Sequence, residues 1–254
     1  EKAAEEARLA AVAEAEAQAL RALEAPEQVA AAAARLRCQS HSRNGAKPVS
    51  RPVPAPVPAS TEQVKLQSVE VLSDHWYTLR KVTFDLRRRD GQWQTLSREA
   101  YDRGNGAALL LYDPRRRTVV LTRQFRLPAF LNGSADGMLI ETCAGLLDGD
   151  DPETCIRREA EEETGYRVRQ PRKVFEAYMS PGSVTEKLHF FVAEYEPQDR
   201  IRTGGGLAHE GEDIEVIEMP LAEALAGIGS GVIEDGKTVM LLQHVALMLQ
   251  EAAG

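Results

Sequence analysis

The stretch DDPETCIRREAEEETGY, residues 150–166, most restricts what the chain can fold into. Asp151 suits a helix N-cap, the proline after it suits the first helical position, and Gly165 suits a left-handed stop. These signals predict one helix, on which Glu159 and Glu163 lie four residues apart and share a face. Two like charges at this spacing weaken a bare helix, so we expect a cation between them. Mg²⁺ or Mn²⁺ fits, because hard cations choose oxygen ligands.

The alternative for an acid-rich helix is a solvated surface. The residue order argues against it, because R-E-A-E-E-E-T-G-Y at 158–166 resembles the second half of the Nudix box, R-E-U-x-E-E-x-G-U, where U is bulky and apolar. Small Ala160 takes the first U place. Asp150 stands where the family has Glu, and Ala144 where it has Gly, with Gly145 one place late. The chain therefore resembles a Nudix hydrolase, a family that cleaves nucleoside diphosphates linked to another moiety, and the departures concern the loop geometry more than the chemistry.

Apolar segments alternate with turn signals along most of the chain and predict an α/β fold, a mixed sheet with helices on both faces. With the resemblance, this becomes a Nudix α/β/α sandwich, preceded by antiparallel strands and a helical or disordered tail. The expected strands are a hairpin at 82–102 about Asp90 and Gly91, then 107–113, 118–125, 138–145, 173–180, 187–195 and 212–220, and the expected later helices are 220–228 and 237–252.

Composition predicts three parts. Residues 1–37, dominated by Ala and Glu, predict a helical tail without a core, with a weak coiled-coil seam as the alternative. Residues 38–63, rich in Ser, Arg and Pro, predict an extended linker. Residues 64–254 are expected to form the Nudix hydrolase domain, with 64–103 as dimerising N-terminal strands and 104–254 as the catalytic core.

Charge and cysteine content exclude several classes of protein. Asp and Glu number 39 against 31 Lys and Arg, a formal net charge of −8, and no long basic block is present. A nucleic-acid polymer is therefore not an expected partner. Three cysteines are too few for a disulfide framework, and no Cys/His spacing suggests zinc. No apolar stretch suits a membrane span and no signal-peptide pattern opens the chain, so we expect a cytoplasmic protein without a membrane partner.

A closer resemblance extends over residues 72–249, where LSDHWYTL, YDRGNGA, RQFR, ETCAGLLD, CIRREAEEETGY, YMSPGSVTE, HFFVAEY, GGG, EDIEV and DGKTV occur in order. This series resembles the bacterial GDP-mannose hydrolase branch of the ADP-ribose pyrophosphatase group. The resemblance implies Mg²⁺-dependent conversion of GDP-mannose and water to GMP and mannose 1-phosphate. It also implies a homodimer whose N-terminal strands exchange between subunits.

The same resemblance implies a set of site residues. The expected metal ligands are the side chains of Glu159, Glu163 and Glu212 with the carbonyl of Ala144, and the expected catalytic residues are Glu162, Glu163 and Glu212. The expected substrate-binding residues are Trp76, Arg98, Glu99, Arg126, Ala144, Gly145, Leu146, Glu186 and Lys237. Trp76, Arg98 and Glu99 would form the nucleobase pocket from the partner subunit.

Several of these residues have an ordinary alternative. Arg126 lies at a strand end and suits a diphosphate clamp, but it would equally suit a surface ion pair with a nearby acid. Trp76 stands where the branch has Tyr, and it would either stack on a base or belong to the hairpin core. Lys237, before the last helix, would reach the sugar or a phosphate, although alone it reads as a surface lysine. Glu186 follows a Pro-Gly turn that could present it to the substrate.

A general base must reach the attacking water, and in this branch it comes from a mobile loop outside the box. In GGGLAHEGEDIEV, Glu212 occupies the matching place just before a strand, and we expect the three glycines to supply flexibility. The loop is longer than the branch leads us to expect, so Glu210 and Asp213 are rivals. The alternative is that all three are loop acids in water.

Two other functions remain open at this stage. An ADP-ribose or ADP-sugar pyrophosphatase is the competing enzyme, because Pro181 stands sixteen residues after Gly165, a spacing that this group also shows. A Nudix-like module that binds nucleotide sugars without cleaving them is the competing non-enzyme, with the Ala-rich helix as an interaction arm. Both metal-face glutamates and a candidate base are present, which argues against an inactive site.

Overall fold

The computed structural model describes residues 58–252. The predicted helical tail, residues 1–37, lies outside this part, as do residues 38–57 of the predicted linker and the side chain of Glu210. The predicted division of the chain into tail, linker and domain therefore remains a prediction.

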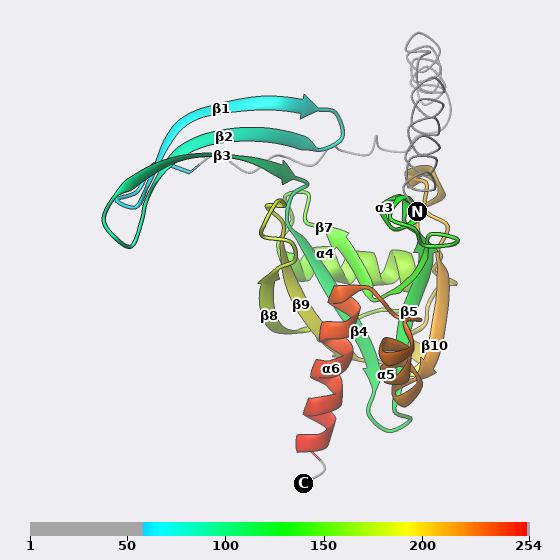
Figure 1. Ribbon diagram of the computed structural model, residues 1–254. Coiled ribbons are helices and arrows are strands. Elements are labelled where there is room, and N and C mark those ends of the chain that lie inside the picture. Colours follow the sequence, from blue (N-terminus) through cyan, green and yellow to red (C-terminus); the bar gives the residue numbers. More distant parts are fainter. Residues whose placement is uncertain (1–57, 253–254) are drawn as a thin grey trace, which may run out of the picture. The chain divides into compact units, whose positions relative to one another are not determined.

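The described chain begins with a three-stranded antiparallel sheet in the order β1-β2-β3. Its strands are β1 (Val64–Asp74), β2 (Thr78–Arg87) and β3 (Trp93–Asp102). The predicted hairpin about Asp90 and Gly91 is confirmed as the connection from β2 to β3, and Gly91 takes the positive φ of 83° that this turn needs. The predicted N-terminal antiparallel strands are thus present (Figure 1).

The second sheet has seven strands, in the order β10-β5-β4-β9-β8, with β6 paired to β5 and β7 paired to β4. Its members are β4 (Gly106–Asp113), β5 (Thr118–Phe125), β6 (Met138–Glu141), β7 (Cys143–Leu146), β8 (Arg172–Tyr178), β9 (Lys187–Glu194) and β10 (Glu215–Pro220). Strand β4 is buried along its whole length, as its apolar run predicts for a central strand. Because β4 and β9 are parallel and the other pairs antiparallel, the predicted mixed sheet is confirmed.

Alternate side chains of the seven-stranded sheet enter two separate cores. Leu110 packs in the core that includes α5 (Leu221–Ser230) and α6 (Gly236–Glu251), while Leu109 packs in the core that includes α4 (Pro152–Glu159). Figure 1 shows the sheet between these two helical layers. The predicted α/β/α sandwich is therefore confirmed, and it follows from the period of two along each strand.

Some elements differ from the sequence-based prediction. The expected strand 138–145 is interrupted at Thr142, whose amide donates to the hydroxyl of Thr238 (2.7 Å) instead of extending one ladder. The expected strand 212–220 begins only at Glu215, so Glu212 lies in a loop. Short helices not predicted from the sequence are α3 (Leu127–Leu131), η2 (Pro197–Asp199) and η3 (Ala208–Glu210), while η1 (Ala160–Thr164) falls within the helix predicted to end at Gly165.

The end of β3 is fixed to the loop that precedes β9. The amide of Tyr101 donates to the carbonyl of Ser183 (2.7 Å), and the amide of Thr185 donates to the carbonyl of Tyr101 (3.0 Å). These two bonds form a short parallel bridge outside the main ladders. Across residues 58–252, no helix combines the length and the apolar character that a membrane span requires.

Candidate active site

The acid-rich helix begins and ends as its sequence predicts. The Asp151 carboxylate accepts from the amides of Glu153 and Thr154 (both 3.1 Å), and Gly165 ends the helix in the left-handed region with φ of 78°. The last turn departs from the prediction, because η1 is a π-helix that directly follows α4. Such wide turns inside α-helices are rare overall, but where they occur they are often found at functional sites. Here the wide turn carries Glu161, Glu162 and Glu163.

Glu163 is a buried carboxylate, with the residue only 2% exposed. Its Oε2 accepts from the amide of Ala144 in β7 (3.3 Å). Burial raises the pKa of Glu163 to about 8, and repulsion from the carboxylates of Glu159 and, more weakly, Glu212 adds to the rise. A divalent cation at this point would offset two of these three negative charges.

Glu159 lies directly against β7 at Gly145. A Cβ atom on Gly145 would overlap the Glu159 carboxylate, so only glycine lets this side chain take its place. This contact gives a physical reason for a glycine at 145, one place after the position where the family pattern has it. Arg158 lies beside both Glu159 and Glu162, since its Nη1 is 2.9 Å from Glu159 Oε1 and 3.1 Å from Glu162 Oε2.

The chemistry of this face fits a hard divalent cation. Glu159 and Glu163 offer carboxylate oxygens, and Mg²⁺ in proteins commonly uses one or two carboxylates and keeps several waters. Within residues 58–252, no three His, Cys, Asp or Glu side chains are gathered closely enough to form a metal site by themselves. A cation here would therefore complete its shell with water, substrate oxygens or a backbone carbonyl such as that of Ala144.

The loop with Glu212 is fixed to the end of this helix. The amides of Gly205 and Gly206 donate to the carbonyls of Glu163 (2.9 Å) and Glu162 (3.1 Å). A Cβ on Gly204 would meet the Glu163 carbonyl oxygen at 2.6 Å. The expected flexibility of the glycines stays a prediction, and the structure shows a further role for them, because they allow the loop backbone to pack closely on the helix end.

Glu212 is half-buried, and its Oε2 accepts from the amide of Leu207 (2.8 Å) within its own loop. Its negative charge also acts on Glu163. The pKa of Glu163 is raised first by burial, then by repulsion from Glu159, and more weakly by repulsion from Glu212. Asp213 is exposed instead. Of these two candidate bases, Glu212 is the one that interacts electrostatically with the metal face.

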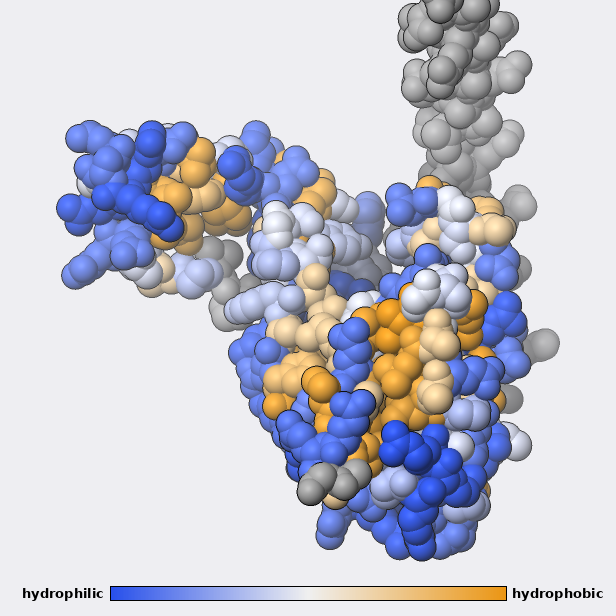
Figure 2. Space-filling view, turned by 60° about the horizontal axis from the view of Figure 1, so that its bottom comes forward, coloured by the Kyte–Doolittle hydropathy of each residue, from blue (hydrophilic) through white to orange (hydrophobic). Residues whose placement is uncertain are grey.

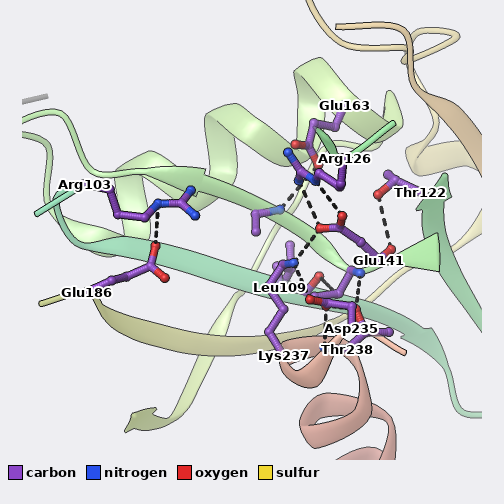
Figure 3. Close-up of polar contacts among 12 residues, drawn as sticks. Arg103, Leu109, Thr122, Arg126, Glu141, Glu163, Glu186, Asp235, Lys237 and Thr238 are labelled. Atoms are coloured by element: carbon purple, nitrogen blue, oxygen red, sulfur yellow. Dashed lines mark hydrogen bonds and ion pairs between the residues drawn. The ribbon is translucent and has the colours of Figure 1, made fainter. Parts of the chain in front are cut away.

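A second group of charges lies beside Glu163 and includes two predicted substrate-binding residues (Figure 3). Arg126 forms a bidentate pair with Glu141, with Nε donating to Oε1 (2.6 Å) and Nη2 donating to Oε2 (3.0 Å). Lys237 Nζ donates to the same Oε2 and to Asp235 Oδ1 (2.8 Å). Arg126 therefore has the acid partner that was its ordinary alternative, and it also lies close enough to Glu163 for mutual attraction.

The remaining predicted residues lie in four other places. Trp76 is in the turn between β1 and β2, 48% exposed, so it is not a core residue of that hairpin. Arg98 and Glu99 are exposed on β3. Glu186 is buried next to Arg103, whose Nε lies 3.3 Å from its Oε1. No contact among the described residues joins Trp76, Arg98 or Glu99 to the glutamates of the helix. Leu146 follows Gly145 in β7, and its carbonyl accepts from the thiol of Cys155 (3.2 Å).

Sequence reasoning assigned no role to three residues of this region, Glu141, Asp235 and Thr238. Their strings, ETCAG and DGKT, were part of the resemblance, but within them only Ala144, Gly145 and Lys237 were given roles. Glutamate in the apolar run MLIE, with isoleucine before it, was the available signal, because a charge seldom enters a buried strand without a partner.

Comparison with known proteins agrees with this geometry. Residues 63–101 match the family "GDP-mannose pyrophosphatase NudK N-terminal domain", and residues 102–242 match the family "NUDIX domain". A GDP-mannose pyrophosphatase of Salmonella arizonae is 57% identical over 185 residues, 73% of this chain and 96% of the relative. One of Escherichia coli O1:K1 is 55% identical over 187 residues, 74% of this chain and 97% of the relative.

A solved structure, "Crystal structure of ADP compounds hydrolase", is similar in fold, with a TM-score of 0.57 and 19% sequence identity, covering 77% of this chain and 98% of that one. The chain belongs to the Nudix family. The resemblance to its GDP-mannose pyrophosphatase branch, expected from the sequence, is confirmed by the two relatives. Nudix hydrolases generally use a divalent metal ion such as Mg²⁺.

Proposed function

We propose that this chain is a Nudix pyrophosphatase that hydrolyses the diphosphate bond of nucleoside diphosphate sugars, with GDP-mannose as the main substrate and GMP and mannose 1-phosphate as products. The observation that carries the proposal is the 57% identity to a GDP-mannose pyrophosphatase over 96% of that relative's length. The retained pair of Glu159 and Glu163 at the helix end supports it independently.

A diphosphate resists attack because its oxygens repel a nucleophile, so a site must offset this charge and activate water. When bound, Mg²⁺, or Mn²⁺ in its place, would supply positive charge at the phosphate oxygens and lower the pKa of a bound water. Glu159, Glu163 and the Ala144 carbonyl would hold the metal ion, and Arg126 and Lys237 would bind phosphate oxygens. Glu162 would keep Arg158 in place beside Glu159.

Glu212 would accept the proton of the attacking water as a new P–O bond forms and the bond from phosphorus to the bridging oxygen breaks. Its half-buried carboxylate and its electrostatic effect on Glu163 support this choice over exposed Asp213. The bond from Leu207 N engages only Oε2 of Glu212, so Oε1 can accept the proton or bind the metal ion. Glu212→Gln is expected to lower kcat by about 100-fold.

We further propose a homodimer in which the three-stranded sheet of each subunit completes the other's site. Large apolar side chains are exposed on this sheet and its first turn, and they include Val69, Val71, Leu72, Trp76 and Trp93. Figure 2 shows hydrophobic surface, in orange, on the three-stranded sheet. Exposed apolar groups of this kind are typical of a protein interface. The candidate nucleobase-binding residues, Trp76, Arg98 and Glu99, are exposed on the same sheet and its turn.

Subunit complementation tests the shared site. Trp76→Ala and Glu163→Gln should each be poorly active alone, but mixed and refolded together they should regain turnover, because hybrid dimers contain one intact site. Size-exclusion chromatography with light scattering measures the dimer itself. A monomer, or no regain on mixing, would contradict the shared site. A cytoplasmic location stays a prediction from the sequence.

The direct test of the function is hydrolysis of GDP-mannose, ADP-ribose and ADP-glucose measured side by side with Mg²⁺. GMP release from GDP-mannose at the highest kcat/KM is the expected result. Preference for ADP-ribose or ADP-glucose would instead favour the ADP-sugar pyrophosphatase, with which the similar solved fold is compatible. Binding of GDP-mannose without any turnover would favour the non-enzymatic module.

A further inference from the structure

Glu141 lies at the end of β6, immediately before the break at Thr142, and the residue is only 1% exposed. Both of its oxygens accept hydrogen bonds, Oε1 from Arg126 Nε and Oε2 from Arg126 Nη2 and Lys237 Nζ. Figure 3 shows the carboxylate between these two cations. One buried side chain thus joins the residue that follows β5 to the first turn of α6.

The position of Lys237 is fixed from a second side. Asp235 binds Lys237 Nζ through Oδ1 (2.8 Å) and caps α6 through Oδ2, which accepts from the amide of Thr238 (3.0 Å) and from its hydroxyl. The Thr238 hydroxyl in turn accepts from the amide of Thr142 (2.7 Å), the residue after Glu141. The start of α6 is therefore tied to the end of β6 through this chain of bonds.

Exposure increases from the carboxylate to the cations. The side chain of Glu141 is 2% exposed, that of Lys237 is 14% exposed and that of Arg126 is 39% exposed. The guanidinium uses Nε and Nη2 for Glu141, which leaves its Nη1 edge for another anion. Arg126 is also attracted by Glu163, so it faces the metal side of the site.

The charges of this group compensate one another, since two carboxylates and two cations sum to zero. A diphosphate is therefore not drawn here by an excess of charge. Glu141 instead holds the long, flexible side chains of Arg126 and Lys237 in one arrangement. Substrate binding then costs less conformational entropy, because these side chains are already ordered. Charged groups held in place before the reaction stabilise developing charge more effectively than mobile ones.

We propose that Glu141 is a positioning residue that holds Arg126 and Lys237 as a matched pair against the phosphate oxygens of the substrate, without touching the substrate itself. Asp235 supports the same arrangement through Lys237. The inference rests on the proposed function, because it assigns the diphosphate to these two cations. A purely structural ion pair joining β5, β6 and α6 is the competing account.

The test compares Glu141→Gln with wild type for kcat, KM and Mg²⁺ half-saturation, using GDP-mannose. The expected result is a loss of about 100-fold in kcat/KM. Mg²⁺ half-saturation should stay unchanged, because Glu159 and Glu163 are untouched. If Glu141→Gln is unfolded at the assay temperature, Glu141→Asp keeps the charge but shortens its reach, and the same kinetic loss is expected.

Asp113→Asn is the matched control for stability. Asp113 is also a buried carboxylate, 4% exposed, and it pairs with Arg116 Nε (2.6 Å) at the turn after β4. This variant should lower Tm as a broken ion pair does, yet leave kcat/KM within about twofold of wild type. A structural role for Glu141 would give its variant the same behaviour as this control.

A double-mutant cycle separates positioning from an independent contribution. Adding Glu141→Gln to Arg126→Ala should lower kcat/KM by clearly less than Glu141→Gln lowers it in wild type, because only the lysine is then left for Glu141 to hold. Full additivity of the two losses would overturn the inference. Equal kcat/KM of wild type and Glu141→Gln would also overturn the inference. A wild-type chain without turnover of any nucleoside diphosphate sugar would overturn the proposed function and this inference together.

Discussion

Glu141 and Glu163 are two buried glutamates in neighbouring parts of one site, and they differ in almost every electrostatic respect. Glu141 is 1% exposed and Glu163 is 2% exposed. Burial alone would raise both pKa values. For Glu141 the bonds from Arg126 and the charge of Lys237 overcome burial and lower the pKa to about 2. For Glu163 burial dominates, repulsion from Glu159 adds to it, and the pKa rises to about 8.

The difference teaches what each carboxylate is suited to do. Glu141 already has its cations within the chain, so it is suited to hold them in place. Glu163 lies beside other acidic side chains, so it is suited to bind a cation that comes from solution. A site for a metal-bound diphosphate needs both kinds of acid, because one part must bind the metal ion and another must arrange the protein's own cations.

The largest effect is expected from neutralising Glu163, the buried glutamate that lies beside other acids. Glu163→Gln should lower kcat by about 1000-fold or more, because the metal ion loses a charged ligand. Its fold should stay intact, since the change also removes a buried repulsion. Glu161→Gln on the same wide turn is the control: its side chain pairs with Arg202 (3.0 Å), and turnover should stay near wild type. An active Glu163→Gln would remove this residue from the metal site.

A smaller loss is expected from moving a metal ligand without changing its charge. Gly145→Ala should displace Glu159 from its place against β7 and lower kcat/KM by roughly 10- to 100-fold. Gly229→Ala in α5 is the control, because a Cβ there meets open space. That variant should keep full activity and gain about 0.5–1 kcal/mol of stability from helix propensity. Equal activity of the two variants would contradict the contact between Gly145 and Glu159.

The two glutamates should also respond to pH in opposite directions. Glu163 keeps its proton in the folded state up to a pKa of about 8, above its ordinary 4.5, so the folded chain binds more protons between these values and stability falls as pH rises. Glu141, with its pKa lowered to about 2, contributes stability above 4.5 that is lost as pH falls.

Thermal unfolding in EDTA and in Mg²⁺ measures this contrast. At about pH 8, Mg²⁺ should raise Tm of wild type by a few degrees because it binds only the folded site. Glu163→Gln should lose most of this gain and most of the fall in stability between about pH 5 and 8. An unchanged pH slope in that variant would show that another group causes it.

The smallest effect is expected outside the site. Removing residues 1–57 should leave kcat/KM and the oligomeric state nearly unchanged, because the family matches begin at residue 63 and both glutamates lie far along the chain. Kinetics and light scattering of the shortened chain check this. If the shortened chain folds but is inactive, residues 1–57 contribute to activity, contrary to this prediction.

Features set by local sequence were predictable. The helix limits at Asp151 and Gly165 depend on neighbouring residues, and the two faces of the sheet depend on alternation along each strand. The spacing of Glu159 and Glu163 follows from the helix between them, although the wide last turn does not. The hairpin about Gly91 follows from the positive φ that this glycine adopts.

Features that depend on distant partners were not predictable. Lys237 and Glu141 are 96 residues apart in sequence, and so are Thr238 and Thr142, so no local pattern reports either contact. The interruption of the strand at Thr142 follows from the second of these contacts. The packing of the three loop glycines was likewise not predicted, because only the folded structure brings their backbone against the carbonyls of the helix end.

The most direct test of the account is to locate the metal ion. Crystals grown with Mn²⁺ and GDP-mannose, using the slow Glu212→Gln variant, would reveal the ion by anomalous scattering. The account predicts a peak bound by the carboxylates of Glu159 and Glu163, with the diphosphate on its open side and next to Arg126. A substrate-bound crystal in which both carboxylates lie away from the ion and the diphosphate would contradict it.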